Sequence, residues 1–324
     1  MQAILCKQYG PPESLVLEEV PSPVAGKGQV VIRVQAAAVN FPDTLIIQNK
    51  YQFKPPLPFS PGGEVAGTVL SVGEEVTTVQ VGQRVLAACT WGGYAEEVVV
   101  AARAVTPLPD GVAMEAAASL TIAYATTYHA LKDRAQLQPG ETMLVLGAAG
   151  GTGLAAVEFG RMMGARVIAA ASTDEKLAAC RAVGADECIN YTTEDLRERL
   201  KALTGGRGVD VVYDPVGGIY TEPAVRSLAW KGRLLVIGFT AGDIPKIPLN
   251  LMLLKGCSVV GVFYGAFTQA EPQLCAANLQ QLLAWVQEGK LRPVVTERHP
   301  LAAAASVLRA FIERRVVGKV VLVP

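Results

Sequence analysis

The chain has 324 residues, 29 basic and 29 acidic side chains, and an apolar fraction of 51%. Its length suggests about two domains with a large core. The zero net charge gives no reason to expect a nucleic acid or an anionic membrane as a partner, and no apolar run approaches the roughly 20 residues that cross a bilayer. The N-terminus turns polar too soon for a signal peptide, so we expect a cytoplasmic protein.

Residues 1–107 contain short apolar runs between Gly and Pro turns, which predicts a small barrel-like β domain. Strands are expected at 30–39, 64–72, 81–85 and 94–100. A loop-rich segment, 40–63, separates the first two, and its five prolines restrict it. Asn40 and Tyr51 make this segment a candidate cleft wall, the alternative being a plain structural connection.

An Ala-rich helical segment follows at 110–135, with the domain switch expected near 120–125. Residues 142–172 then have the pattern strand, glycine turn, helix, strand. The turn GAAGGTG (147–153) has the G-x-G-x-x-G register, with Ala148 at the first glycine position. Such a turn lets the backbone and the free N–H groups of the next helix approach a pyrophosphate. We therefore predict a dinucleotide site with Gly150, Gly151, Thr152 and Gly153 as contacts, the alternative being a glycine turn without a nucleotide.

The alternation of helices and strands continues to residue 262, which predicts a doubly wound parallel sheet. The expected helices are 173–183 (with Ser172 or Thr173 as N-cap), 194–204 and 221–229, and the expected strands are 187–191, 209–213, 233–238 and 258–262. The tail reads as helices 276–287 and 302–312 and a last strand, 318–323.

The cysteines and histidines predict no metal site. None of the six cysteines forms a C-x-x-C pair, and the only histidines, His129 and His299, have no ligand spacing. We expect free thiols and structural or surface histidines.

Seven motifs occur in order along the chain: VNFPD (39–43), LPFSPGGEVAGTV (57–69), VGQRV (81–85), GAAGGTG, INY (189–191), YDPVGG (213–218) and GKVVL (318–322). With them the chain resembles the medium-chain dehydrogenase/reductase superfamily, and within it the zinc-free quinone oxidoreductase branch related to ζ-crystallin. The resemblance implies an α/β protein with a discontinuous GroES-like β-barrel domain (1–122 and 266–324) and a Rossmann NADPH-binding domain (123–265). It also implies an active site in the interdomain cleft and a homodimer through the sheet edge at 258–262.

The zinc ligands of the related alcohol dehydrogenases are missing from the motifs. Asn40 stands near the position of a catalytic cysteine, Gly63-Glu64 replaces the end of a GHE motif, and no four-cysteine lobe is present. Three ligands are the usual minimum for a catalytic zinc. We therefore expect zinc-independent chemistry.

The choice of cofactor depends on the residues after the second strand of the dinucleotide unit. An NAD site usually has an Asp or Glu there, about twenty residues past the glycine turn, whereas this chain has Ser172. Asp174 and Glu175 fall in the first helical turn, where acidic residues are favoured anyway. The resemblance places Lys176, Tyr191 and Arg314 at an adenosine 2′-phosphate, so we predict NADPH. The alternative for Lys176 is a solvated helix charge.

The nicotinamide half of the site is expected at later strand ends. Gly217 should lie beside the nicotinamide ribose, and Phe239, Phe263 and Tyr264 follow apolar strands. The resemblance adds Thr126. Core packing is the alternative for each of these side chains.

Tyr51 and Asn40 are the candidate catalytic residues. In quinone oxidoreductases a tyrosine of this loop faces the nicotinamide, and in related enoyl-thioester reductases a tyrosine in an I-Q-x-x-Y setting is the proposed proton donor. This chain has that pattern at 47–51. A neutral phenol can donate a proton in a dry site.

The resulting prediction is zinc-independent, NADPH-dependent hydride transfer to quinones or similar electrophilic acceptors. One alternative is reduction of activated C=C bonds, as in enones or enoyl thioesters. An alternative of another class is a non-catalytic NADPH-binding protein, since some members of the branch have bulk or RNA-binding roles. The zero net charge gives RNA binding no electrostatic support.

Overall fold

The computed structural model describes all 324 residues, which form two compact units. Unit 1 comprises Met1–Ala123 and Leu279–Pro324, and unit 2 comprises Tyr124–Asn278. The domain boundaries expected at 122/123 and 265/266 stay a prediction. The compact units switch at 123/124 and 278/279, the latter inside helix α10 (Pro272–Gln287). No helix has both the length and the apolar character to cross a membrane.

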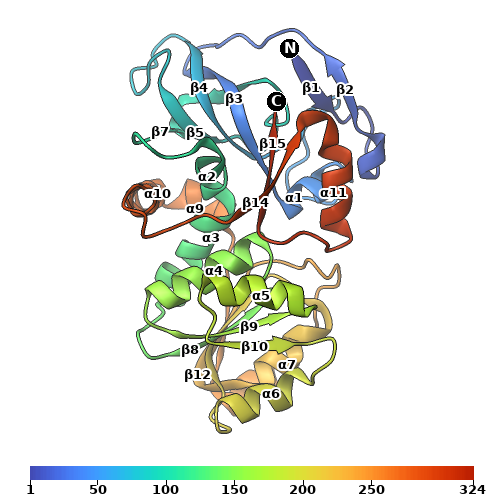
Figure 1. Cartoon of the computed structure of the whole chain (residues 1–324), viewed down its shortest axis with the longest axis vertical. Coiled ribbons are helices and arrows are strands. Elements are labelled where there is room, and N and C mark those ends of the chain that lie inside the picture. Colours follow the sequence, from blue (N-terminus) through green and yellow to red (C-terminus); the bar gives the residue numbers. More distant parts are fainter. The chain divides into compact units, whose positions relative to one another are not determined.

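Unit 1 is built on a seven-stranded sheet, in which β14, β15, β3, β4, β5 and β7 follow one another in that order (Figure 1). The seventh strand, β6, also pairs with β3. Long runs of β-branched and small apolar residues in β3 and β4 fill its core, which includes Ile32, Val65 and Val85. The last strand returns to pair antiparallel with β3, Val320 opposite Val39. The strands are β1 (Gln2–Leu5), β2 (Val16–Glu19), β3 (Gln29–Val39), β4 (Glu64–Val72), β5 (Arg84–Ala88), β6 (Glu97–Ala101), β7 (Val105–Pro107), β14 (Val295–Pro300) and β15 (Lys319–Val323).

Apart from α10, which the two units share, the helices of unit 1 are short. They are α1 (Phe41–Ile46), α2 (Met114–Ala118) and α11 (Ala304–Ile312), with 3-10 turns η1 (Pro12–Ser14), η2 (Ala102–Ala104) and η6 (Leu301–Ala303). The π-helical turn η3 (Leu120–Tyr124) carries the chain into unit 2.

Unit 2 has a parallel six-stranded sheet in the order β10-β9-β8-β11-β12-β13. Its strands are β8 (Thr142–Leu146), β9 (Arg166–Ala171), β10 (Glu187–Asn190), β11 (Val209–Asp214), β12 (Leu228–Val236) and β13 (Ser258–Gly261). Its helices are α3 (Ala125–Tyr128), the π-helical η4 (His129–Arg134), α4 (Gly151–Met162), α5 (Asp174–Val183), α6 (Leu196–Leu203), η5 (Gly218–Tyr220), α7 (Thr221–Arg226), α8 (Asn250–Lys255) and α9 (Tyr264–Ala270). Strands β8, β9 and β10 extend from the centre of the sheet to one edge, and β11, β12 and β13 extend from the centre to the other edge. This order confirms the predicted doubly wound sheet.

Several local predictions need correction. The segment 40–63 was expected to be loop, yet α1 begins at its start, because the Asp43 carboxylate accepts a hydrogen bond from the Asn40 N–H (2.8 Å) and Pro42 is tolerated in a first helical turn. The strands expected at 81–85 and 94–100 begin only at Arg84 and Glu97. The helix expected to reach 229 ends at Arg226, because the strand expected at 233–238 already begins at Leu228. Helices α8 and α9 and strand β14 were not predicted, since each is short and without a clear period.

Candidate active site

All strand ends predicted to carry ligand contacts lie at one edge of the unit 2 sheet. Because the six strands are parallel, the residues that follow them share the carboxyl edge. The strand order reverses there between β8 and β11, the place where open α/β sheets form their binding crevice. Five predicted residues follow five different strands at this edge: Ser172, Tyr191, Gly217, Phe239 and Phe263.

The glycine turn leaves room for a phosphate at the start of α4. A Cβ on Gly153 would lie 2.4 Å from the carbonyl oxygen of Gly147, so only glycine lets the helix pack on the turn. A Cβ on Gly150 would meet nothing closer than 3.5 Å. Gly150 is also the N-cap and has no side chain to cap the helix, so the first-turn N–H groups stay available. These features fit a bound pyrophosphate.

Helix α3 is tied to this turn through a threonine that the sequence did not single out. Thr127 Oγ1 lies 2.8 Å from Tyr213 Oη and 3.3 Å from the carbonyl oxygen of Thr152. Burial raises the pKa of Tyr213, so its phenol stays neutral. Thr126, the predicted contact, is the half-buried neighbour of Thr127 on α3.

A buried aspartate shapes the loop after β11. Asp214 accepts hydrogen bonds from the N–H groups of Val216 and Gly217 (both 2.8 Å) and from Thr221 Oγ1 (2.6 Å). Gly217 has φ 72°, and a Cβ there would lie 2.8 Å from the ring of Phe239. The structure therefore brings Gly217 and Phe239 together, and Asp214 acts as their scaffold.

At the end of β9 a hydroxyl and an ammonium group stand together. Lys176 Nζ donates to Ser172 Oγ (3.1 Å). Of the two expected N-caps, Thr173 is the one that accepts from the Lys176 N–H (3.3 Å). On the neighbouring strand end, the ring of Tyr191 packs 4.4 Å from that of Tyr220. This arrangement has the chemistry expected for a phosphate on the ribose 2′ oxygen.

Two aromatic residues follow β13. Phe263 is half exposed and precedes α9, and Tyr264 Oη lies 3.4 Å from Cys275 Sγ. Helix α9 is held by His129, whose ring stacks on Phe267 with centroids 3.7 Å apart and whose Nδ1 lies 2.9 Å from Asp133. The imidazole of His129 is thus engaged in packing.

In unit 1, Asn40 belongs to a buried polar network. Lys319 Nζ donates to Asn40 Oδ1 (2.6 Å) and to Glu64 Oε1 (2.9 Å), and Asn40 Nδ2 also donates to Glu64 Oε1 (2.9 Å). The other Glu64 oxygen accepts from Thr121 Oγ1 and the Ile122 N–H (both 2.8 Å). All of the network's charged groups are at most 2% exposed. Both ends of the Asn40 amide are therefore bound to protein partners.

By the resemblance, Asn40 and Gly63-Glu64 stand where the related alcohol dehydrogenases have zinc ligands. The side chains of Asn40 and Glu64 are both engaged in this network. Glu64 has four protein partners, and no group of three or more His, Cys, Asp or Glu side chains is placed to hold a metal ion. All six cysteines are free.

Tyr51 is half-buried and packs against the hydrophobic core of unit 1. The centroid of its ring lies 5.8 Å from that of the Phe53 ring. Burial and the nearby Asp43 carboxylate raise the pKa of Tyr51. Burial also raises the pKa of Asp43 to about 6, although Asp43 Oδ2 accepts from the Asn40 N–H and from Tyr94 Oη (both 2.8 Å). Tyr51 is therefore a neutral phenol at physiological pH.

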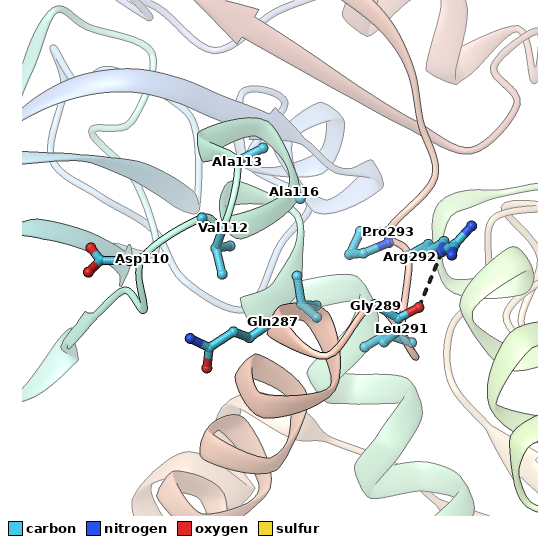
Figure 2. Close-up of a pocket in the computed structure, with 11 residues that line it drawn as sticks. Asp110, Val112, Ala113, Ala116, Gln287, Gly289, Leu291, Arg292 and Pro293 are labelled. Carbon is cyan, nitrogen blue, oxygen red and sulfur yellow. Dashed lines mark hydrogen bonds between the residues drawn. The ribbon is translucent and has the colours of Figure 1, made fainter.

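Two further features belong to unit 1 and not to the unit 2 sheet. Arg314 follows α11 and belongs to unit 1, whereas Ser172, Lys176 and Tyr191 belong to unit 2. A hollow of about 330 Å³ in unit 1 is lined by residues 110–113, 116, 286–287, 289 and 291–293, with Asp110 and Arg292 at opposite ends (Figure 2). It contains none of the predicted site residues.

Comparisons with known proteins identify the family. Residues 26–110 match the model of the alcohol dehydrogenase GroES-like domain, and residues 151–285 match that of the zinc-binding dehydrogenases. The chain is 39% identical to "Quinone oxidoreductase-like protein 2 homolog" of Nematostella vectensis, over 99% of this chain and 88% of that protein. The chain belongs to the quinone oxidoreductase branch of the medium-chain dehydrogenase/reductase superfamily.

Solved members of the branch have the same fold. The Escherichia coli quinone oxidoreductase "complexed with NADPH" aligns with a TM-score of 0.94 at 29% identity, covering 100% of both chains. The quinone oxidoreductase of Thermus thermophilus, solved also as "its complex with NADPH", aligns with a TM-score of 0.86 at 39% identity and the same coverage. The predicted family and the combination of a GroES-like with a Rossmann domain are confirmed.

The sequence did not point to several residues that make the buried contacts described above. Lys319 is the clearest case, although a signal existed: it is a lone charge that opens an apolar strand in the GKVVL motif. Asn190, in the INY motif, and Thr127 were also overlooked. Thr127 meets Tyr213 and Thr152, and Asn190 meets Asp174, on other strands or helices, so no local pattern points to these contacts.

Proposed function

We propose that this chain is an NADPH-dependent oxidoreductase that transfers a hydride to quinones or similar electrophilic acceptors. The Ser172–Lys176 pair at the end of β9 carries the choice of cofactor. A hydroxyl and an ammonium favour a 2′-phosphate, where an NAD-selective site has a carboxylate. The acceptor class follows from the relatives, which are named quinone oxidoreductases.

The cofactor would be held by residues of the carboxyl edge and would supply the hydride. The N–H groups of 150–153 would bind the pyrophosphate, and Ser172, Lys176 and Tyr191 would bind the 2′-phosphate. Arg314 of unit 1 is the further contact predicted for this phosphate. The nicotinamide half would contact Thr126, Gly217, Phe239, Phe263 and Tyr264.

The protein's own acid would be Tyr51. Its raised pKa keeps the phenol protonated, so it can give a proton to an acceptor oxygen or carbon. Asn40 would be a positioning residue and not a reacting group, because its amide, at the start of α1, is bound to Glu64 and Lys319. A neutral phenol also suits the second candidate function, reduction of an activated C=C bond, whose enolate product needs a proton.

A screen of NADPH oxidation at 340 nm tests these assignments. The acceptors are a small quinone, an enone and an enoyl-CoA, each with wild type and with Lys176→Ala. Turnover of the quinone supports the proposal, and turnover of the thioester alone replaces it with the second candidate. NADPH binding without turnover of any acceptor would favour a non-catalytic NADPH-binding protein.

We also propose a homodimer through β13. This strand ends the unit 2 sheet, so its outer N–H and C=O groups have no strand partner. Exposed apolar side chains lie in β13 and shortly before it along the chain. Val259 of β13 is 48% exposed, and Leu249, Leu253 and Leu254 of the α8 region are 72–82% exposed. Pairing with a second copy would cover this edge.

A further inference from the structure

Asp174 is a carboxylate in a place where the proposed cofactor would disfavour it. It is the first residue of α5, two positions after Ser172, and it is exposed. A carboxylate free to turn toward Ser172 would repel a 2′-phosphate and could accept a hydrogen bond from the 2′-hydroxyl of NADH. The selectivity of the pocket therefore depends on where this side chain is held.

A buried asparagine of the neighbouring strand holds it. Asn190 ends β10, directly beside Ala171 at the end of β9, and is 8% exposed. Its Nδ2 donates to Asp174 Oδ1 (3.0 Å). Its Oδ1 accepts from the N–H (3.2 Å) and the hydroxyl (2.7 Å) of Thr192. Both ends of the amide are engaged, so its orientation, and with it that of the carboxylate, is fixed.

The same residue is clamped by the turn that follows it. The N–H of Asn190 donates to Glu194 Oε2 (2.8 Å), and its carbonyl oxygen accepts from the Glu194 N–H (2.8 Å). Thr192 Oγ1 also lies 3.0 Å from the carbonyl oxygen of Ser172. Asn190 thus connects the Asp174 carboxylate to the turn that carries Tyr191.

We propose that Asn190 sets the preference for NADPH over NADH by fixing the Asp174 carboxylate, so that Ser172 and Lys176 face the 2′-phosphate without a competing negative charge. The proposal rests on the proposed NADPH-dependent function. Asn190 is a positioning residue here, because it acts through Asp174.

Binding measurements on the full chain separate this role from general loss of structure. Affinities for NADPH, NADH, 2′,5′-ADP and 5′-AMP are measured by titration calorimetry for wild type, Asn190→Ala, Asp174→Asn and the double variant. Asn190→Ala should weaken the binding of NADPH and 2′,5′-ADP about 10-fold, the scale of a like-charge contact near a surface. The affinities for NADH and 5′-AMP should stay the same or increase, because the freed carboxylate can accept from their 2′-hydroxyl. In the double variant the affinity for NADPH should return to within about 2-fold of wild type, because the freed side chain no longer carries a charge.

Thr192→Val is the matched control. It removes the hydroxyl contacts to Asn190 and to the Ser172 carbonyl. The Thr192 N–H still donates to Asn190 Oδ1, and the Asn190–Asp174 bond remains, so the amide keeps its orientation and the NADPH preference should be retained. Equal weakening of NADPH and NADH by Asn190→Ala, or no recovery in the double variant, would overturn the role of Asn190. A wild-type chain that binds NADH more tightly than NADPH would overturn the cofactor assignment itself, and this proposal with it.

Discussion

Replacing Lys319 by methionine should destabilise unit 1 by several kcal/mol. The ammonium is almost wholly buried and donates to Glu64 Oε1 (2.9 Å) and Asn40 Oδ1 (2.6 Å). Removing one partner of a buried ion pair typically costs about 3–5 kcal/mol, because the other charge stays buried. Glu64 would keep hydrogen bonds from Asn40, Thr121 and the Ile122 N–H. We therefore expect about 3 kcal/mol, the lower end of that range.

The companion substitution Glu64→Gln should recover part of this loss. In the Lys319→Met background, a glutamine can still accept from Thr121 and the Ile122 N–H. Its NH2 then faces Asn40 Nδ2, so the Asn40 amide must turn to present Oδ1 to it. The substitution removes the buried charge that Lys319→Met leaves unpaired. The double variant should be more stable than Lys319→Met alone by about 1–3 kcal/mol, the usual coupling between residues in one network.

Urea unfolding at pH 7.5 measures these differences. The two units can unfold separately, so the reporter must belong to unit 1. In a Trp230→Phe background the remaining tryptophans, Trp91 and Trp285, both lie there. Lys27→Met is the matched control, since Lys27 pairs with Glu75 at 2.8 Å but both side chains are 67% exposed; it should cost less than about 1 kcal/mol. A Lys319→Met variant no less stable than this control would refute the reasoning, as would further loss on adding Glu64→Gln.

Four further outcomes are expected. Because burial raises the folded-state pKa of Asp43 from 3.8 to about 6, its stabilising contribution is complete below about pH 4 and is lost as the pH rises through 6. The stability of Asp43→Asn relative to wild type should therefore increase from pH 4 to 7 in urea titrations, and a constant difference would contradict this. Tyr51→Phe should lower kcat about 10-fold or more for an enone but far less for a quinone, whose reduced oxygen water can protonate; equal losses would remove the proton-donor role. Lys176→Ala should raise the KM for NADPH about 10-fold and leave that for NADH unchanged, and parallel changes would argue against a 2′-phosphate contact. Val259→Lys should convert a dimer to a monomer in sedimentation velocity, whereas an unchanged mass would place the interface elsewhere.

The sequence by itself determined the elements whose signals are local. The strand, glycine turn and helix around Gly150 follow from one contiguous pattern, and the Thr173 N-cap and the Gly184 stop of α5 fall within a few residues of the helix they bound. The alternation of such elements predicted the parallel sheet, and a parallel sheet necessarily gathers its strand ends at one edge. Ser172, Tyr191 and Gly217 each follow a predicted strand, so the alternation alone puts them at that edge, whereas the role of Tyr191 came from the family resemblance.

Only the tertiary structure decided which polar groups meet. Lys319 lies 255 positions from Glu64 and 279 from Asn40 along the chain, and its strand returns to β3 to join them. Asn190 reaches Asp174 because β10 and β9 are neighbours in the sheet. A side chain's type gives its charge and hydrogen-bonding capacity, but its partner depends on strand order and register, which periodicity along a single segment does not encode.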